Sequence, residues 1–286
     1  MPAQVRPLTD DDAPAVLDCM VAAFSDLERR FHHPPSPPSP AGAGLVRIRH
    51  LVRTDPGGAW GAEAGGRLVG AALALVRDGL WGLSLLVVEP TSQSGGIGGA
   101  LLRAALAHGD GARGGIILAS EDPRALRSYA RAGFALRPAF DARGEVRRPP
   151  GTPARVRPVA WPRDRDLIVA AGRAVRGAGH GGEIPAWLAA GSTVLVHEEG
   201  GFAVHAGGAV KLVAAERDEV ARELLCAILA AVGEGDRVSV DFITAGQDWA
   251  VGAVLDAGLD LRAGGAVCVR GDVGPLRPYV PSGSYL

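Results

Sequence analysis

The sequence predicts an α/β (α+β) protein built from two tandem, similar domains. Each domain is expected to hold a mixed, mostly antiparallel twisted sheet flanked by helices. Two observations support this fold class: strand patterns first follow one another and then alternate with helical patterns, and this succession occurs twice. At 286 residues the chain is long enough for two domains that each bury a core of their own.

An internal repeat carries the prediction of two domains. Val5-Arg6-Pro7-Leu8 leads into a helical pattern, and Val156-Arg157-Pro158-Val159 opens the second half in the same way. Later, Ala132-Gly133-Phe134-Ala135-Leu136-Arg137 is echoed by Ala257-Gly258-Leu259-Asp260-Leu261-Arg262. Both echoes occur in the same order between similar elements, which a duplicated domain explains.

Hydrophobic periodicity and turn residues predict the order of elements in each half. The elements expected in the first half are a strand (4–7), a helix (12–25), a proline-rich loop (32–44), strands (58–64, 67–77 and 80–88), a helix (97–108), a strand (115–120), a helix (123–132) and a strand (134–138). Those expected in the second half are a helix (167–175), strands (193–197, 201–205 and 209–214), a helix (219–231), a strand (237–244), a helix (247–255) and a strand (260–269).

Two segments are expected to lie outside packed elements. Residues 143–153 are rich in proline and charge, so they are expected to form a linker. A boundary near Gly151 then gives domains 1–150 and 151–286. The uncharged tail, 278–286, is expected to be a loose terminus, with a return to the first domain as the alternative.

Bulk composition argues against several classes of protein. Thirty basic residues balance thirty-one acidic ones, so nothing indicates a nucleic-acid partner. No run of about 18 apolar residues indicates a membrane span, and the N-terminus lacks the apolar core of a signal peptide. Cys19, Cys226 and Cys268 lie far apart without metal-ligand spacing, so reduced thiols and no metal site are expected. These observations predict a cytoplasmic protein.

A glycine turn is the clearest functional signal. Gln93-Ser94-Gly95-Gly96-Ile97-Gly98-Gly99 follows an apolar strand pattern and opens a helix. Glycines let backbone NH groups approach a ligand, and the first NH groups of a helix have no partner within it, so the turn suits a phosphate. A dinucleotide fingerprint would follow the first strand, and a P-loop would need Gly-Lys-Ser/Thr, so neither fits. A tight turn without a ligand is the alternative.

The arrangement resembles the GNAT superfamily of N-acetyltransferases. Gln93, Gly96 and Gly98 match that family's Q/R-x-x-G-x-G/A loop, and Val88-Glu89-Pro90 matches its strand end. A second family motif is matched by Asp122, Ala125, Tyr129, Gly133 and Phe134, except that Asp122 stands where the family often has Asn. The resemblance covers nearly all of the first half and implies a tandem-domain member.

The resemblance implies acetyl-CoA, or another acyl-CoA, as co-substrate, with no metal. Backbone near Val88 would pair with the pantetheine arm, and the loop would hold the pyrophosphate. The implied cofactor-binding residues are Val87, Val88, Gln93, Ser94, Gly95, Gly96, Ile97, Gly98, Gly99, Asp122, Ala125 and Tyr129.

Acyl transfer to an amine needs a neutral nucleophile and a proton for the departing thiolate. Tyr129 fits the second role, and Glu89, at the strand end, is the candidate for the base. Alternate positions on the strand, Leu86, Ser84 and Gly82, are expected to share one face, and they offer no carboxylate. A base acting through water, or from elsewhere in the chain, stays open.

The acceptor is expected to be a primary amine of a small molecule or peptide. The resemblance places the acceptor wall after the first helix, so Asp26, Glu28, His32 and His33 are candidate contacts, together with Ser84. A catalytically silent acyl-CoA-binding regulatory or interaction protein is the alternative, and a homodimer stays open.

The second half lacks the functional signals. Aligning the repeats puts Val254 opposite Tyr129, and 213–219 stands where the glycine loop should be. Carboxylates at that helix start would repel a pyrophosphate. The second domain is therefore expected to be degenerate.

Overall fold

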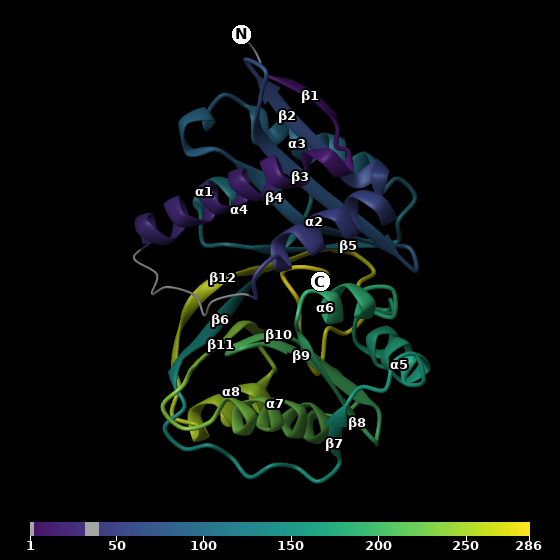
Figure 1. Ribbon diagram of the computed structural model, residues 1–286, viewed down its shortest axis with the longest axis vertical. Coiled ribbons are helices and arrows are strands. Elements are labelled where there is room, and N and C mark those ends of the chain that lie inside the picture. Colours follow the sequence, from purple (N-terminus) through teal and green to yellow (C-terminus); the bar gives the residue numbers. More distant parts are fainter. Residues whose placement is uncertain (1–2, 32–39) are drawn as a thin grey trace.

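One twisted sheet of thirteen strands runs through both halves of the molecule (Figure 1). The computed structural model describes residues 3–31 and 40–286. The strand order is β1-β2-β3-β4-β5-β12-β6-β11-β10-β9-β8-β7, and β13 pairs with β10 outside this path. Nearly all pairs are antiparallel; β4 with β5 and β10 with β11 are parallel. The predicted fold class, a mixed and mostly antiparallel sheet flanked by helices in each of two similar halves, is confirmed.

The first half follows the predicted order of elements. Its strands are β1 (Gln4–Pro7), β2 (Ala59–Ala64), β3 (Arg67–Arg77), β4 (Leu80–Val88), β5 (Gly114–Ala119) and β6 (Ala135–Glu145). Its helices are α1 (Ala13–Phe31), α2 (Ala43–Thr54), α3 (Ile97–Ala107) and α4 (Pro123–Arg131), with short 3-10 turns at Asp10–Asp12, Pro56–Gly58 and Pro90–Ser92.

The second half repeats this plan. Its strands are β7 (Val156–Pro158), β8 (Thr193–His197), β9 (Gly201–Ala206), β10 (Ala209–Ala215), β11 (Arg237–Thr244), β12 (Asp260–Gly271) and β13 (Tyr279–Val280). Its helices are α5 (Arg165–Arg176), α6 (Ile184–Ala189), α7 (Asp218–Val232) and α8 (Asp248–Asp256).

The sixth strand of each half is exchanged into the sheet of the other. β12, from the second half, pairs with β5, and β6, from the first half, pairs with β11. The two exchanged strands also pair with each other in the middle of the sheet. Three strand pairs therefore join the first half of the chain to the second, and the two halves, or lobes, share one continuous sheet.

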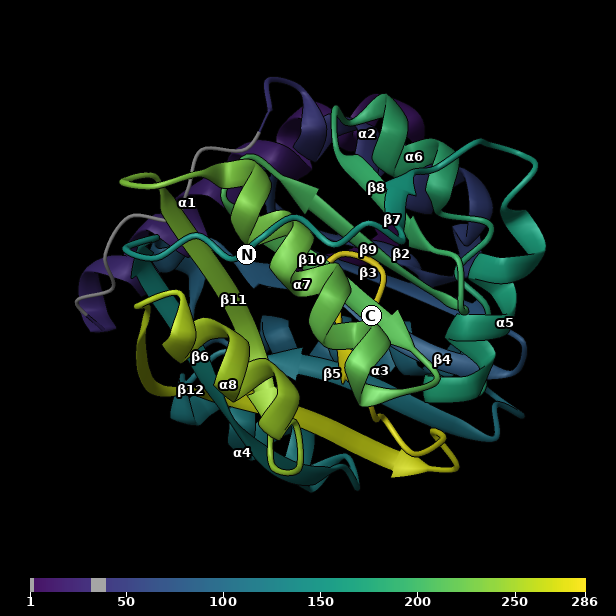
Figure 2. The same cartoon turned by 90° about the horizontal axis from the view of Figure 1, so that it is seen from below.

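Helices cover the two faces of the sheet unequally. Near the first half, α3 and α4 pack on one face, and α1 and α2 pack on the other. Near the second half, α7 and α8 cover one face, as the view from below shows (Figure 2). The core residues of α5 and α6 belong to the same cluster as those of α1 and α2, so the space between the lobes is a packed core.

Three helical features differ from the prediction. α1 continues to Phe31, beyond the predicted end at residue 25, and α2 and α6 were not predicted. α2 buries Ile48, Leu51 and Val52, a short apolar stripe beside a proline-rich stretch, and α6 has only six residues. Both helices are stabilised by contacts with the other lobe, which a local pattern does not reveal.

The segment predicted as a linker begins inside a strand. β6 extends to Glu145, and Val146 is fully buried. The prediction that residues 143–153 support no packed element is therefore wrong at their start. Pairing with β11 supplies hydrogen bonds and a core contact that composition alone does not indicate.

The C-terminal tail is buried rather than loose. Tyr279, Val280, Tyr285 and Leu286 are each at most 2% exposed. The segment returns between the lobes, where the label C marks the chain end in Figure 1. The expectation of a loose terminus is wrong because apolar tail residues fill the core between the halves.

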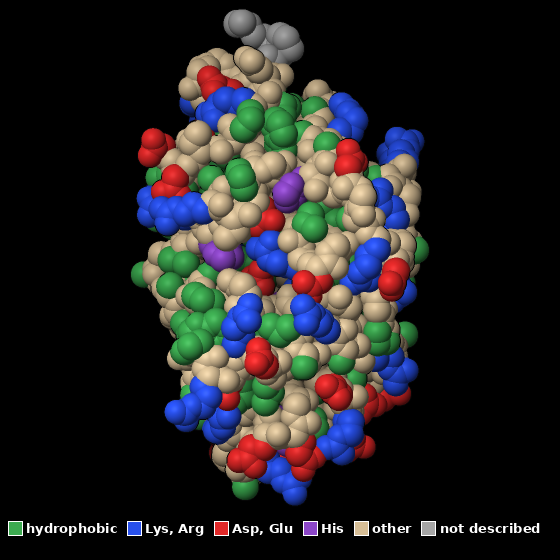
Figure 3. Space-filling view, turned by 90° about the vertical axis from the view of Figure 1, so that its right-hand side faces the viewer, with side chains coloured by type: hydrophobic (Ala, Val, Ile, Leu, Met, Phe, Trp, Pro, Cys, Tyr) green, Lys and Arg blue, Asp and Glu red, His purple; other side chains and the backbone are tan. Residues whose placement is uncertain are grey.

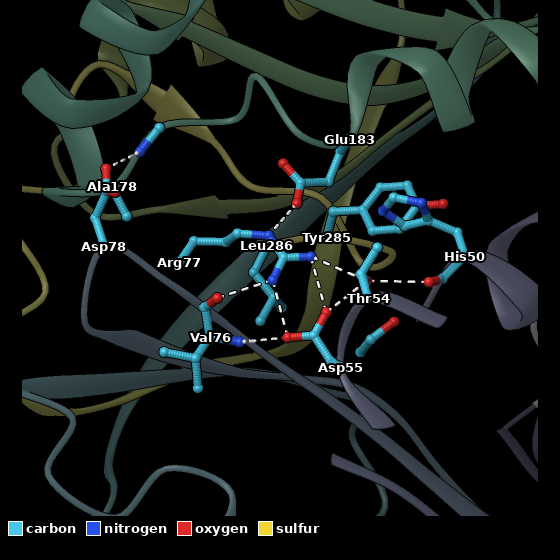
Figure 4. Close-up of polar contacts among 12 residues, drawn as sticks. His50, Thr54, Asp55, Val76, Arg77, Asp78, Ala178, Glu183, Tyr285 and Leu286 are labelled. Atoms are coloured by element: carbon cyan, nitrogen blue, oxygen red, sulfur yellow. Dashed lines mark hydrogen bonds and ion pairs between the residues drawn. The ribbon is translucent and has the colours of Figure 1, made fainter. Parts of the chain in front are cut away.

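A buried ion cluster joins the lobes beside the tail (Figure 4). Arg77, at the end of β3, makes two 2.9 Å hydrogen bonds to the carboxylate of Asp55 and pairs on its other side with Glu183, before α6. Tyr285 stacks edge-on against His50 of α2. Glu183 is fully buried, and burial raises the pKa of its carboxyl although Arg77 opposes the shift. The cluster ties α2, the β3–β4 hairpin and the second lobe together.

The outer surface carries mixed charge. On the face shown in Figure 3, basic and acidic side chains are interspersed with apolar ones over both lobes. Among the described residues, no helix is both long and apolar enough to cross a membrane.

Candidate active site

β4 and β5 separate halfway along their length. Their paired residues end at Leu83 and Ile117, whereas β4 stays paired with β3 as far as Val88. Ser84 has no partner on β3, because the register shifts there by one residue. From Ser84 to Val88, the edge of β4 that faces β5 is therefore open.

The prediction that Leu86, Ser84 and Gly82 share one face of β4 is wrong, because the strand contains a bulge at Ser84. Gly82 and Ser84 face α2 and the tail, since Leu286 lies over Gly82 and Ser84 Oγ donates to the carbonyl of Ser284 at 2.6 Å. Leu86 packs with the core under α3 and α4, on the opposite face. A strand alternates strictly only without a bulge, and the inserted residue reverses the alternation.

The glycine turn lies at the end of this open edge. Gly96 has a φ of 80° and caps α3, and Ser94 also has a positive φ of 70°. A Cβ built on Gly95, Gly98 or Gly99 meets no atom closer than 3.6 Å, and one on Gly96 meets none within 4 Å. Packing within the chain therefore does not require these glycines. The space above them fits the approach of a phosphate to the backbone.

Gln93 links the loop to its surroundings. Its Nε2 donates to the carbonyl of Val88 at 3.0 Å, and its Oε1 accepts from Arg124 of α4 at 2.8 Å. The side chain thus joins the end of β4 to the start of α4 across the gap between β4 and β5.

Asp122 is held by two arginines at the mouth of the gap. It caps α4 by accepting from the backbone NH of Arg124, and it pairs with the side chains of Arg124 at 2.7 Å and Arg30 at 3.0 Å. Burial by itself would raise the pKa of Asp122, but these hydrogen bonds outweigh it and lower the pKa to about 2. Arg30 comes from the end of α1, so the ion pair connects the two sides of the gap.

Tyr129 lies on α4, one turn after Ala125, and is 6% exposed. Its neighbours in the core include Cys268 of β12 and Phe134. The hydroxyl makes no hydrogen bond to any residue that the structure describes. Burial raises the pKa of the phenol above its usual value, so Tyr129 stays protonated at neutral pH.

Glu89 follows β4 and forms a two-pronged ion pair with Arg67, with distances of 2.9 and 3.3 Å. Its backbone NH donates to Val69 of β3. The carboxylate is therefore already engaged by a guanidinium beside the strand end.

The candidate acceptor residues lie in two places. Asp26 pairs with Arg29 and Arg30 near the end of α1, and Glu28 is on the same helix. Ser84 lies at the bulge of β4 instead. His32 and His33 lie outside the described residues. Arg30 links the end of α1 to the start of α4, since it pairs with both Asp26 and Asp122.

Three arginines of the site were not anticipated from the sequence: Arg30, Arg47 and Arg124. Arg47, on α2, donates to the hydroxyl of Ser84 at 2.9 Å and to the carbonyl of Gly283 at 3.1 Å. It thereby fastens the tail to the bulge. The chain holds many arginines, and no spacing distinguishes these three, so no sequence signal would have identified them.

The second half fills the corresponding gap with its own chain. β10 and β11 separate after Val210 and Val240, as β4 and β5 do. There β13 pairs with β10, Val280 lying opposite Val213, and the NH of Ala215 approaches the carbonyl of Pro278 at 3.4 Å. The strand edge that is open in the first half is thus covered in the second.

The helix start next to this second gap also differs. α7 begins at Asp218, after a two-residue connection from the end of β10, and its first turn carries Asp218 and Glu219. These carboxylates stabilise the positive end of the helix but would repel a phosphate. Within the described residues, no group of three or more His, Cys, Asp or Glu side chains could hold a metal ion.

Comparison with known proteins gives one family and several similar folds. Residues 21–134 match the family model described as the acetyltransferase (GNAT) family. No curated protein matches the chain in sequence. A putative acetyltransferase from Pyrococcus horikoshii is 15% identical, with a TM-score of 0.80, and the match covers 100% of this chain and 96% of that one.

Two further solved structures share the fold over both halves. A tandem GNAT protein from the clavulanic acid biosynthesis pathway is 18% identical, with a TM-score of 0.59 and coverage of 94% of this chain and 98% of that one. A GCN5-related N-acetyltransferase from Sphaerobacter thermophilus is 15% identical, with a TM-score of 0.57 and coverage of 95% and 96%. At these identities the similarity concerns the fold.

Proposed function

Because residues 21–134 match the acetyltransferase (GNAT) family model, we propose that this chain transfers an acetyl group from acetyl-CoA to a primary amine, at one site in its first half. The observation that carries the proposal is the gap between β4 and β5. An open strand edge and a glycine turn with free space above it lie along this gap, and α4, which carries Tyr129, begins at its mouth.

Binding of the donor is supported by groups that have no role in packing. The backbone NH groups of 94–99 can approach the pyrophosphate, because the glycines leave the space above them free. At the open edge, Val88 offers its backbone NH to pantetheine, since its carbonyl already accepts from Gln93 Nε2. The carbonyl of the other proposed residue, Val87, lies against Gly70 of β3. Arg124 and Gln93 stand at the mouth of the gap, with Asp122 and Ala125 on the α4 side.

Acetyl-CoA supplies an activated acyl group as a thioester. The amine nitrogen attacks the thioester carbon, a C–N bond forms, the C–S bond breaks, and the sulfur takes a proton. Tyr129 is the proposed donor of that proton, since burial keeps its hydroxyl protonated. The excess proton of the amine is transferred to a base, for which Glu89 stays the candidate. To accept the proton, the Glu89 carboxylate would have to keep one oxygen free of Arg67 or lose that ion pair.

The acceptor is proposed to enter on the face of Ser84, opposite α3. Asp26 and Glu28, at the end of α1, are proposed contacts for an ammonium group on its way to the gap. Arg47 and the tail form the wall beyond Ser84, so they limit the size of an amine that reaches the bulge. A small-molecule amine fits this arrangement better than a folded protein.

The alternative function, a silent acyl-CoA-binding protein, rests on a specific observation. The nearest carboxylate of the strand end, Glu89, is neutralised by Arg67. The alternative predicts CoA binding without acceptor-dependent release of thiol.

Tyr129→Phe is the experiment that distinguishes the two functions. The hydroxyl has no hydrogen-bond partner among the described residues, so its removal should change stability little. Release of CoA with a panel of small amines should fall about 100-fold in kcat, with an unchanged Kd for CoA. Tyr279→Phe is the control, because it loses a 3.0 Å bond to His180 away from the gap and should lower stability instead. Equal rates for wild type and Tyr129→Phe would refute the proposed acid.

A further inference from the structure

A cavity of about 410 Å³ lies on the second lobe, away from the gap between β4 and β5. It opens at the ends of β6, β11 and β12. Four arginines and two carboxylates line it: Arg143, Arg147, Arg237, Arg262, Glu145 and Asp260, with Gly144 between them. A volume of this size is in the usual range for small-molecule sites.

The arginines share one face of the sheet. Along the same strands, Ala142, Val146, Val238 and Leu261 face the core under α7 and α8. Residues at the alternate positions must therefore point to the opposite face. Three strands thus direct their guanidinium groups into one space.

Among the described residues, the nearby carboxylates form ion pairs with only two of these four arginines. Arg147 pairs with Asp260 at 3.5 Å, and Arg143 pairs with Asp241 at 3.0 Å and with Asp141 at 3.8 Å. In the part of the chain that the structure describes, neither Arg237 nor Arg262 has a carboxylate within 4.0 Å.

Two guanidinium groups of the lining keep an unpaired donor. Arg143 Nε and Arg262 Nη2 are shielded from solvent, and neither has a hydrogen-bond partner among the described residues. Because solvent does not reach these two atoms, a ligand in the open cavity would meet the other nitrogens of the two guanidinium groups.

The first half closes the equivalent surface. There the face of β5 and β12 is covered by the chain that leads to the tail, with Val273 and Leu276 buried. Asp272 lies so close that a Cβ on Gly114 would be 2.1 Å from its carbonyl. In the second half, α5 and α6 pack on β8, β9 and β10, so the face of β6, β11 and β12 stays open. The cavity therefore results from a difference between the two halves.

We propose that this cavity is a second binding site, for a small molecule that carries two or more oxyanion groups. Guanidinium forks bind phosphate and carboxylate oxygens in pairs, and the four arginines outnumber the two lining carboxylates. Phosphate and carboxylate are the two sources of this chemistry. The site is separate from the proposed acetyl-CoA site and does not depend on acetyl transfer.

Calorimetric titration of the full chain tests the site, with pyrophosphate and citrate as the two probes, each measured with and without CoA. At least one probe should bind with a 1:1 stoichiometry that CoA leaves unchanged. The tighter probe identifies the chemistry. Arg237→Gln and Arg262→Gln should each weaken binding about tenfold or more.

Arg222→Gln is the matched control, because Arg222 pairs with Asp256 on the outside of α7 and α8. It should bind the probes like the wild type. The proposal is overturned if neither probe binds, if Arg237→Gln and Arg262→Gln bind as tightly as the control, or if CoA abolishes binding. The last result would place the anion at the glycine turn.

Discussion

Ser84 of β4 and Lys211 of β10 occupy equivalent positions in the two halves. Each is the unpaired residue of a bulge, and each follows the last residue pair of the parallel strands that then separate. Beyond Ser84 the strand edge is open, whereas beyond Lys211 it is covered by β13. One duplicated architecture therefore yields one open gap and one closed gap.

Gly96→Ala should weaken CoA binding more than it weakens the fold. A Cβ there would meet nothing within 4 Å, but the φ of 80° is a left-handed conformation that costs an alanine about 1 kcal/mol. The Kd for CoA should rise about tenfold, because the methyl group enters the phosphate cradle. Gly111→Ala is the control, since Gly111 has a φ of 81° and the same open space outside the cradle; it should lose similar stability in urea unfolding and bind CoA normally. Unchanged CoA affinity in Gly96→Ala would contradict the cradle.

Arg77→Met should strongly destabilise the protein. The change leaves Asp55 and Glu183 buried without their shared cation, which costs about 3–5 kcal/mol for a buried ion pair. Arg173→Met is the control, since Arg173 is 60% exposed in its pair with Asp78. It should cost little stability, because solvent screens an exposed ion pair. Urea unfolding of both variants measures the difference, and equal losses would argue against a structural role for the buried cluster.

Asp122→Asn should make stability less dependent on pH in acid. The folded pKa of Asp122 is lowered to about 2 from an ordinary 3.8 by Arg124 and Arg30, against the effect of burial. The charged form is thus favoured in the folded state, so its stabilisation is present above about pH 4 and is lost as the pH falls towards 2. The free energies of unfolding of wild type and variant should converge over that range. A constant difference from pH 6 to pH 2 would show that the two ion pairs do not stabilise the fold.

Gly82→Val should displace the tail from β4. A Cβ at Gly82 would lie 2.0 Å from Leu286 Cδ1, and Leu286 is only 1% exposed, so it has little room to move. Overpacking of this kind costs about 1–3 kcal/mol. Thermal unfolding and limited proteolysis of the tail should both report the change. Gly151→Val, where a Cβ meets nothing within 4 Å, should behave like the wild type.

Much of the site could be predicted because its signal is local. The glycine turn from Gln93 to Gly99 and the helix carrying Tyr129 both depend on neighbouring residues, and both lie where the sequence places them. The bulge at Ser84 is different. It arises from the pairing of β4 with β3, so the sequence pattern alone put Leu86 and Ser84 on the same face.

The amino-acid sequence by itself determined the duplicated fold class, the order of most elements and the glycine turn, because periodicity, caps and turn residues act over short distances. The tertiary structure alone decided the exchange of β6 and β12, the burial of the tail and the ion pair of Arg30 with Asp122. These features join residues that lie far apart in the sequence. Such partners are selected by the free energy of the whole packed sheet, in which a local pattern can fit several neighbours.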